Sequence, residues 1–255
     1  MTRIFLPPEE LASNQIKITG EQARYLSLVL RVTPGETITI LDGAGRRYTC
    51  RIIQVHKKEV LAEKIKEELY SAESPISITL AQGLPKGEKM DLIIQKSTEL
   101  GVKKIIPLIT EHAEVRETGK LERWRKIALS AAQQSGREKI PEIESPVSLN
   151  EFLGKHETVI ASPDISGRSN LKNSFGIIFS ETEKNQTLKK VLKNFKDCTD
   201  IAILIGPEGG FSHEEVTLAI NSGVIPASLG PRILRTETAA ITAMSILQYE
   251  MGDAG

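Results

Sequence analysis

Cysteine, histidine and aromatic residues are few in this chain of 255 residues, and their scarcity excludes several kinds of site. The two cysteines, Cys50 and Cys198, and the four histidines are scattered, so no zinc or haem ligand spacing occurs. We therefore expect no bound metal, and we interpret both cysteines as reduced thiols. Runs of about 18 apolar residues are missing, so we expect no membrane span. The N-terminal MTRIFLPPEE lacks the apolar stretch of a signal peptide, which predicts a cytoplasmic protein.

An excess of charge of either sign is absent as well. Lys and Arg together number 33, as do Asp and Glu, so the formal net charge is zero. A neutral chain exerts no long-range attraction on nucleic acid, so any RNA-binding surface must be a local patch. Positive side chains do cluster between residues 46 and 58, at Arg46, Arg47, Arg51, His56, Lys57 and Lys58.

The first 72 residues are dominated by alternation of apolar and polar residues, which is typical of strands. Strands are expected at residues 36–41, 48–55 and 60–65. One helix is expected at residues 21–31, because Tyr25, Leu28 and Val29 recur at helical spacing. Short strands around one helix indicate a small barrel. We interpret the polar residues 66–75 as a linker to a second domain.

From residue 76 onward, apolar runs of strand length alternate with helical patterns. Strands are expected at residues 76–82, 102–109, 158–161, 201–205 and 227–229. Helices are expected at residues 88–100, 121–135, 212–221 and 236–251. Residues 163–175 are polar and rich in turn signals. Alternating strands and helices predict an α/β domain with a mostly parallel sheet. We therefore expect one domain at residues 1–72 and another at residues 73–255.

A glycine-rich loop lies within IAILIGPEGGFS, residues 201–212. A buried strand is expected to end at Gly206, and Ser212 with Glu215 has the spacing of a capping box at the next helix. Glycines let the backbone approach a ligand, and ligands of open α/β sheets bind beyond the carboxyl ends of strands. The run matches neither the Rossmann nor the Walker fingerprint. Taken alone, it is read equally well as an ordinary strand-to-helix turn.

A second loop, in SLGPRILRTETAA at residues 228–240, has the same design. A strand again ends in Gly-Pro, and a turn with Arg232 and Arg235 follows. A helix is expected to begin with Thr236 as its N-cap and Glu237 in its first turn. Capping and solvation explain each of these residues separately. Two consecutive units of one kind, however, place both glycine loops at one edge of the sheet, which favours a binding site.

The helix expected at residues 236–251 is apolar nearly all round. Such a helix must be covered on several sides. Its cover is either a partner subunit or the rest of its own subunit, and the sequence leaves both alternatives open.

Five long motifs, in order along the whole chain, resemble those of the RsmE family. They are VLRVTPGE, GLPKGEKMDLIIQKSTELGV, QQSGREKIPEI, IGPEGGFSHEE and LGPRILRTETAA. This family comprises the bacterial 16S rRNA (uracil(1498)-N3)-methyltransferases of the SPOUT class. The resemblance implies methyl transfer from S-adenosyl-L-methionine (AdoMet) to N3 of one uridine in the 16S rRNA of the small ribosomal subunit.

The resemblance also implies a fold that composition and spacing did not show. Residues 1–72 would form a PUA-like, RNA-binding β-barrel. Residues 73–255 would form a SPOUT domain whose parallel sheet carries a trefoil knot, a rare exception to the rule against threaded chains. Two subunits would pair at this knot, so a homodimer is expected.

Site residues follow from the same motifs. The AdoMet pocket implied by them comprises Ile205, Gly206, Pro207, Glu208, Gly209, Gly210, Leu229, Gly230, Ile233, Leu234 and Thr236. Ala161 and Ser162, at the end of an earlier strand, are expected to add a third wall. The residues expected to contact RNA are Arg3, Arg31, Lys86, Lys89 and Arg137.

The expected chemistry consists of positioning and electrostatic stabilisation. Arg235 or Arg232 would stabilise an anionic uracil, and Glu208 or Glu237 would accept the N3 proton; the choice within each pair stays open. Two other readings remain. One is a related enzyme that methylates a ribose 2′-hydroxyl or another base. The other is a ribosome-assembly factor that has the fold without the chemistry.

Overall fold

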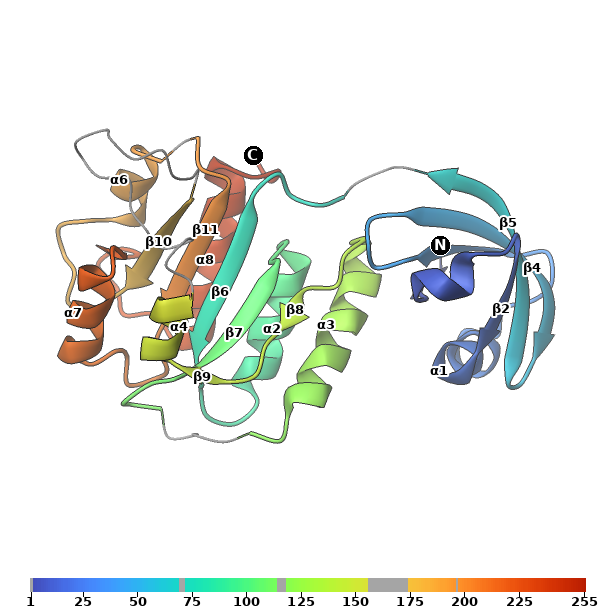
Figure 1. Ribbon diagram of the computed structural model, residues 1–255, viewed down its shortest axis with the longest axis horizontal. Coiled ribbons are helices and arrows are strands. Elements are labelled where there is room, and N and C mark those ends of the chain that lie inside the picture. Colours follow the sequence, from blue (N-terminus) through green and yellow to red (C-terminus); the bar gives the residue numbers. More distant parts are fainter. Residues whose placement is uncertain (1, 69–71, 114–117, 156–173, 196) are drawn as a thin grey trace. The chain divides into compact units, whose positions relative to one another are not determined.

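The structure is a computed structural model that describes residues 2–68, 72–113, 118–155, 174–195 and 197–255. The chain forms two compact units (Figure 1). The N-terminal unit contains Met1–Glu73 and Leu129–Ile140, and the C-terminal unit contains Ser74–Ala128 and Pro141–Gly255. Helix α3 (Leu121–Ser135) is therefore shared, with its last two turns assigned to the N-terminal unit. Its bounds are those expected from its periodicity.

A curled five-stranded sheet forms the N-terminal unit (Figure 1). Its strands, in spatial order, are β1 (Thr2–Phe5), β3 (Thr37–Leu41), β4 (Arg47–His56), β5 (Glu59–Glu68) and β2 (Gln15–Thr19). Strands β1 and β3 are parallel, and the other neighbours are antiparallel. The strands alternate, so that Ile16, Ile18 and Ile38 point into a core that excludes water. The prediction of a small β-rich unit is confirmed, although β1 and β2 were not expected.

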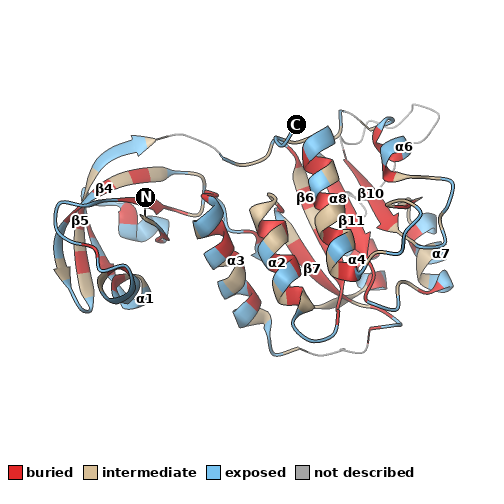
Figure 2. Ribbon diagram, turned by 180° about the vertical axis from the view of Figure 1, so that it is seen from behind, coloured by how far each residue is buried: buried red, intermediate tan, exposed pale blue. Residues whose placement is uncertain are grey.

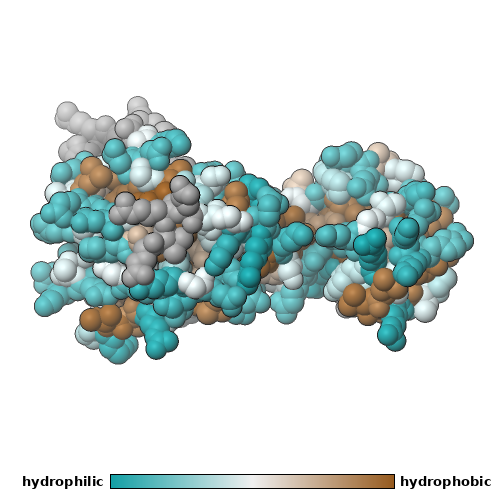
Figure 3. Space-filling model, turned by 90° about the horizontal axis from the view of Figure 1, so that it is seen from below, coloured by the Kyte–Doolittle hydropathy of each residue, from teal (hydrophilic) through white to brown (hydrophobic). Residues whose placement is uncertain are grey.

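The helix expected at residues 21–31 is divided into two parts. After η1 (Pro8–Leu11) and β2, the chain forms α1 (Gly20–Arg24) and then a π-helical turn, η2 (Tyr25–Val29). The backbone N–H of Leu30 donates to the carbonyl of Tyr25, five residues back, at 2.9 Å. Arg31 follows with φ of 52°, the left-handed conformation that side chains rarely adopt. Leu28 and Val29 are exposed here. Figure 3 shows that the surface as a whole is mainly hydrophilic, with scattered hydrophobic patches.

A buried ion pair joins two distant segments of the N-terminal unit. The guanidinium of Arg137 donates to the Glu73 carboxylate at 2.6 Å, and Glu73 also accepts the backbone N–H groups of Glu138 and Lys139. Glu138, which is fully buried, accepts from Arg47 at 3.2 Å and from the N–H of Ala72. The expected RNA contact of Arg137 is thereby corrected, because its side chain is only 6% exposed.

The linker expected at residues 66–75 is corrected for the same reason. Strand β5 continues to Glu68, and Glu73 belongs to the buried ion pair. A polar stretch was read as a linker because its charged side chains were assumed to face water.

A seven-stranded, all-parallel sheet forms the centre of the C-terminal unit. Its strands, in spatial order, are β12 (Ile225–Ala227), β10 (Ser174–Phe179), β11 (Asp200–Ile205), β6 (Ser77–Gly83), β7 (Lys104–Ile109) and β8 (Glu142–Ile143), with β9 (Val147–Ser148) also paired to β7. The predicted α/β class with a parallel sheet is confirmed. Residues 158–161, one of the expected strands, lie outside the described residues, and β10 was not expected.

Helices cover both faces of this sheet (Figure 2). They are α2 (Lys89–Glu99), α3, α4 (Leu149–Lys155), α6 (Leu188–Leu192), α7 (His213–Asn221) and α8 (Thr236–Glu250). Both faces need cover because strand β11 has apolar side chains on each side. Ile201 and Ile203 join the core under α2 and α8. Ala202 and Leu204 join the core under α4 and α7. Parallel strands buried on both sides read as continuous apolar runs.

Helix α8 is covered along one side within its own subunit. Ala240, Ala243, Met244 and Leu247 are fully buried, whereas Tyr249 is 65% exposed. The predicted trefoil knot stays a prediction, because residues 156–173 of this unit lie outside the described residues. No helix in the described part of the chain is long and apolar enough to cross a membrane.

We predict that the Glu73–Arg137 pair stabilises the N-terminal unit. Arg137→Ala leaves a buried carboxylate without its cation, and we expect the free energy of unfolding of this unit to fall by about 3 kcal/mol. Native-state hydrogen exchange of β3 and β4 measures this loss. As a control, Arg125→Ala breaks an exposed pair with Glu122 and should cost less than about 0.5 kcal/mol. Equal, small effects in both variants would contradict a structural role for Arg137.

Candidate functional site

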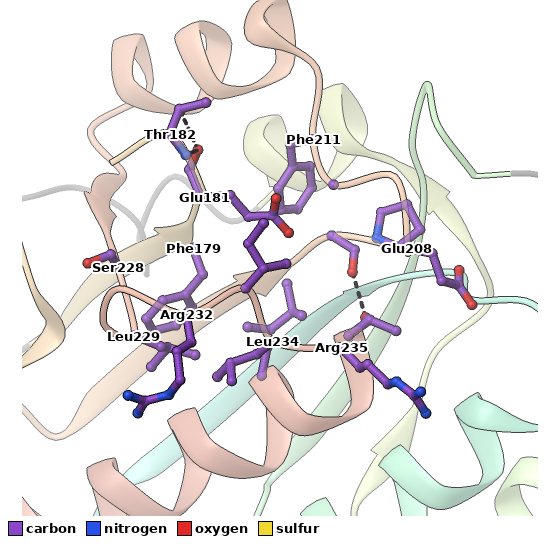
Figure 4. A pocket seen from close by; sticks show the side chains of 18 of the residues that line it. Phe179, Glu181, Thr182, Glu208, Phe211, Ser228, Leu229, Arg232, Leu234 and Arg235 are labelled. Atoms are coloured by element: carbon purple, nitrogen blue, oxygen red, sulfur yellow. Dashed lines mark hydrogen bonds between the residues drawn. The ribbon is translucent and has the colours of Figure 1, made fainter. Parts of the chain in front are cut away.

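A cavity of about 790 Å³ opens where β10, β11 and β12 end and α8 begins (Figure 4). Its size is within the range usual for small-molecule sites. The first glycine loop contributes Ile205, Gly206, Pro207, Glu208, Gly209, Gly210 and Phe211. The second contributes Ala227, Ser228, Leu229, Gly230, Pro231, Arg232, Ile233, Leu234, Arg235, Thr236 and Ala239. The third wall is made by Phe179, Ser180, Glu181 and Thr182, and Lys89 of α2 also reaches the cavity.

The first glycine loop turns sharply after β11. The N–H of Gly210 donates to the carbonyl of Pro207 at 3.0 Å, and Gly210 has φ of 71°. A Cβ on Gly206 would lie 2.9 Å from the Gly210 carbonyl carbon, so a side chain there would open the turn. The chain then enters α7 through the predicted capping box, in which Ser212 and Glu215 exchange hydrogen bonds. That prediction is confirmed.

The end of β6 supports this loop from beneath. A Cβ on Gly83 would lie 2.5 Å from Cδ of Pro207, so the two backbones touch only because residue 83 is glycine. The fully buried Gln82 lies beside it, and its amide nitrogen donates to the hydroxyl of Thr236 at 2.9 Å. That hydroxyl in turn donates to the carbonyl of Gly206 at 2.6 Å.

Thr236 was expected to be the N-cap of the last helix, and this is corrected. The N-cap position of α8 is Arg235, without a side-chain capping bond, and Thr236 is the first helical residue. Its hydroxyl is already used by the carbonyl of Gly206, so it is not available to cap the helix. Glu237 lies in the first helical turn, as expected.

Glu208 is held by the segment that precedes α2. Its carboxylate accepts the backbone N–H of Lys86 at 3.1 Å and the ammonium of Lys89 at 2.5 Å. Partial burial by itself would raise the pKa of Glu208, but these hydrogen bonds, together with that from its own N–H, outweigh it and lower the pKa below the ordinary value. A carboxylate with a lowered pKa is a weak base, so Glu208 is better suited to holding the loop than to accepting a proton.

The two arginines of the second loop leave the cavity in different directions (Figure 4). Arg232 and Arg235 both line the cavity and are exposed, and Figure 4 shows their guanidinium groups diverging. Glu237 does not line the cavity; its side chain is partly buried, and its Oε2 has no hydrogen-bond partner among the described residues. The two glutamates proposed as proton acceptors are therefore in different surroundings.

The remaining predicted residues are distributed as follows. Ala161 and Ser162, the expected third wall, lie outside the described residues, and residues 179–182 line the cavity beside the two glycine loops. Arg3 and Arg31 are in the N-terminal unit, and Lys86 is exposed before α2. The wall could have been found from the apolar run SFGIIF, because parallel strands all end at one edge of a sheet.

The cavity has the features that AdoMet requires. Leu229, Ile233 and Leu234 offer apolar surface at the cavity, and Ile233 is 77% exposed. The glycine loops bring backbone polar groups to the cavity without side chains in between. Glu181 extends over the cavity (Figure 4), which places a negative charge near a cationic ligand. No cluster of metal-ligating side chains occurs in the described part of the chain.

Comparisons with known proteins show the family of this chain. The model of an RNA methyltransferase domain matches residues 72–248, and that of an RNA methyltransferase PUA domain matches residues 18–65. The ribosomal RNA small subunit methyltransferase E of Buchnera aphidicola subsp. Acyrthosiphon pisum is 35% identical over 98% of this chain and 94% of that protein. The chain belongs to the ribosomal RNA small subunit methyltransferase E family. The resemblance to this family in the sequence is thereby confirmed.

Solved structures of methyltransferases are similar over the whole chain. The ribosomal RNA small subunit methyltransferase E from Neisseria gonorrhoeae, bound to S-adenosyl methionine, has a TM-score of 0.87 and 35% identity, with 100% of both chains covered. A methyltransferase from Legionella pneumophila, in complex with the same cofactor, has a TM-score of 0.84 and 37% identity over 99% of both chains. The predicted fold class, an α/β parallel sheet with a PUA-like N-terminal unit, is confirmed.

We predict that Glu208 stabilises the fold only in its ionised form. Because its pKa is lowered in the folded chain, its contribution should be present above the ordinary value of 4.5 and be lost as the pH falls through the lowered pKa. The difference in melting temperature between the unsubstituted chain and Glu208→Gln, measured against pH, should therefore shrink in acid. Glu250→Gln, at an exposed carboxylate, should show no such trend. A difference that is constant with pH would contradict this account.

Proposed function

We propose that this protein methylates N3 of one uridine in the 16S rRNA of the small ribosomal subunit, the target U1498 implied by its family, with AdoMet as methyl donor. The observation that carries the proposal is the cavity formed by both glycine loops in a chain that is 35% identical, from end to end, to a structure bound to S-adenosyl methionine. A related target, such as a ribose 2′-hydroxyl or another base, and a non-catalytic assembly factor are the alternatives that the first experiment separates.

The cofactor would be held by the residues that were predicted from the sequence and that also line the cavity. These are Ile205, Gly206, Pro207, Glu208, Gly209, Gly210, Leu229, Gly230, Ile233, Leu234 and Thr236. When bound, AdoMet supplies an electrophilic methyl group on a cationic sulfonium. Residues 179–182 would add a further wall, and the contribution of Ala161 and Ser162 stays a prediction.

The chain would contribute charge stabilisation at the target base. Uracil N3 becomes nucleophilic when it loses its proton, so a cation beside the base favours the reactive form. Arg235 lies at the start of α8 and Arg232 in the loop before it, and both line the cavity. We propose that Arg235 takes this role, because its backbone is adjacent to Thr236, whose hydroxyl is hydrogen-bonded to the first loop.

Two carboxylates were candidates for the proton acceptor, Glu208 and Glu237, and the structure bears on both. Glu208 lines the cavity, but Lys86 and Lys89 already hold its carboxylate and its pKa is lowered. Glu237 has an unpartnered oxygen but does not line the cavity. Glu208 has a lowered pKa and Glu237 is not at the cavity wall, so we propose that Arg235 promotes loss of the proton to solvent and that Glu208 positions the first glycine loop.

RNA would be bound through the N-terminal unit. We propose residues 1–72 as the PUA-like RNA-binding domain and residues 73–255 as the methyltransferase domain. Arg31 is exposed in a conformation that costs about 1 kcal/mol, and such strain is concentrated at functional positions. Arg3 and the cluster from Arg46 to Lys58 add positive charge for phosphates. Lys89 lines the cavity and Lys86 is exposed before α2, and we propose that both also contact RNA. We further propose a homodimer that acts in the cytoplasm, where ribosomal subunits are assembled.

The identity of the methylated nucleoside tests this proposal. Purified protein is incubated with labelled AdoMet and small ribosomal subunits that lack modifications, and the rRNA is digested to nucleosides. We expect label in 3-methyluridine. Label in a 2′-O-methylated nucleoside or another base would replace the proposed target, and AdoMet binding without any transfer would favour the assembly factor.

A second prediction concerns Arg235. Arg235→Ala removes the proposed cation, so we expect kcat to fall by about 10²- to 10³-fold while the Kd for AdoMet changes little. Arg235→Lys keeps the charge and should restore part of the rate. Arg125→Ala, an exposed arginine on α3, serves as control and should leave kcat unchanged. Turnover near the unsubstituted rate in Arg235→Ala would exclude the proposed role.

A further inference from the structure

Gln82 is a buried polar side chain that none of the motifs singled out. It lies at the carboxyl end of β6 and is fully buried, but it does not line the cavity. Its amide nitrogen is within 3.5 Å of four oxygen atoms, which belong to Thr236, Gly83, Gly206 and Ile205. Only a donor can face so many acceptors, so the orientation of the amide is unambiguous.

Three of these acceptors belong to the walls of the cavity. Ile205 and Gly206 form the start of the first glycine loop, and Thr236 ends the second. The nitrogen lies 2.9 Å from the Thr236 hydroxyl and 3.4 Å from the Gly206 carbonyl oxygen, which are themselves hydrogen-bonded to each other at 2.6 Å. One amide group therefore connects β6 to both loops at the point where they meet.

Gln248 is a second buried glutamine and differs from Gln82 in how its amide is paired. It lies near the other end of α8 and is 2% exposed. Its nitrogen donates to the carbonyl of Leu100 and its oxygen accepts the hydroxyl of Ser74, so both ends of the amide are paired. In Gln82 the oxygen has no partner among the described residues, an arrangement that costs stability. Such a cost is typical of residues kept for function.

We propose that Gln82 is a positioning residue for the AdoMet pocket, acting through the Gly206 carbonyl and the Thr236 hydroxyl. The inference rests on the proposed function and adds to it a residue outside the cavity. Without the amide, the Gly206 carbonyl and Thr236 lose their common donor, and the two loops are joined here only by the hydrogen bond from the Thr236 hydroxyl to the Gly206 carbonyl. The pocket would then have to be ordered by the cofactor, which weakens binding.

Binding of AdoMet to matched variants tests the proposal. Met is close to Gln in length and lacks the amide, so Gln82→Met is compared with Gln248→Met by calorimetric titration with AdoMet alone. We expect the Kd to rise about tenfold in Gln82→Met and to stay within about twofold in Gln248→Met, although both lose a buried hydrogen bond. Saturating AdoMet should restore kcat on small ribosomal subunits in Gln82→Met, because the residue does not touch the reacting atoms.

A double variant shows whether Gln82 acts through Thr236. If both hold the same carbonyl, Gln82→Met with Thr236→Val should weaken binding less than the product of the two single effects. Gln82→Asn, which retains an amide on a shorter side chain, should lose less affinity than Gln82→Met and provides the comparison if Gln82→Met does not fold.

Two results would overturn the proposal. One is an unchanged Kd in Gln82→Met or, where that variant does not fold, in Gln82→Asn. The other is an equal loss of affinity in the Gln82 and Gln248 variants, which would reduce the effect to general destabilisation. Absence of AdoMet binding by the unsubstituted chain would instead refute the proposed function itself, and this inference with it.

Discussion

The contact between the end of β6 and the first glycine loop is the constraint on which the site depends. Gly83 lies against Pro207 so closely that a single Cβ would collide with it at 2.5 Å. This approach brings the neighbouring Gln82 under the carbonyl of Gly206 and close to Thr236. The loop cannot be moved toward β6 or given a side chain at Gly206 without breaking one of these contacts. The position of the first glycine loop is consequently set by backbone contacts.

A second support holds the same loop from the opposite side. Glu208 is bound to the N–H of Lys86 and to the ammonium of Lys89, at the start of α2. His112 packs against Gly209 and lies 3.0 Å from its carbonyl through Nδ1. The loop is thus fixed before any ligand arrives, and a preformed pocket avoids the cost of ordering it on binding. Glu208, which the sequence offered as a proton acceptor, is hydrogen-bonded to Lys86 and Lys89 and so holds the backbone of the loop.

Elements whose signals are local could be predicted from the sequence. Helix α3, the capping box of Ser212 and Glu215, and both glycine loops follow from periodicity and turn chemistry, and the structure has them where expected. Predictions failed where the deciding contact is distant in sequence. Thr236 did not cap its helix because Gly206, 30 residues away, takes its hydroxyl, and Arg137 did not face solvent because Glu73 lies beside it. Residues 179–182 were missed because the apolar run SFGIIF before them was not recognised as a strand.

Arg137 and Gln82 are both buried and polar, yet the acceptors that they bind assign them to different tasks. Arg137 donates to Oε2 of a carboxylate whose Oε1 accepts two backbone N–H groups, so both oxygens of Glu73 are hydrogen-bonded. Gln82 meets backbone carbonyls and a hydroxyl that line a cavity, and leaves its own oxygen unpaired. An apolar side chain at that position would remove the unpaired oxygen, but it would also leave these buried acceptors without their donor. We attribute the amide of Gln82 to its effect on the position of the Gly206 carbonyl, which outweighs the stability that its unpaired oxygen costs.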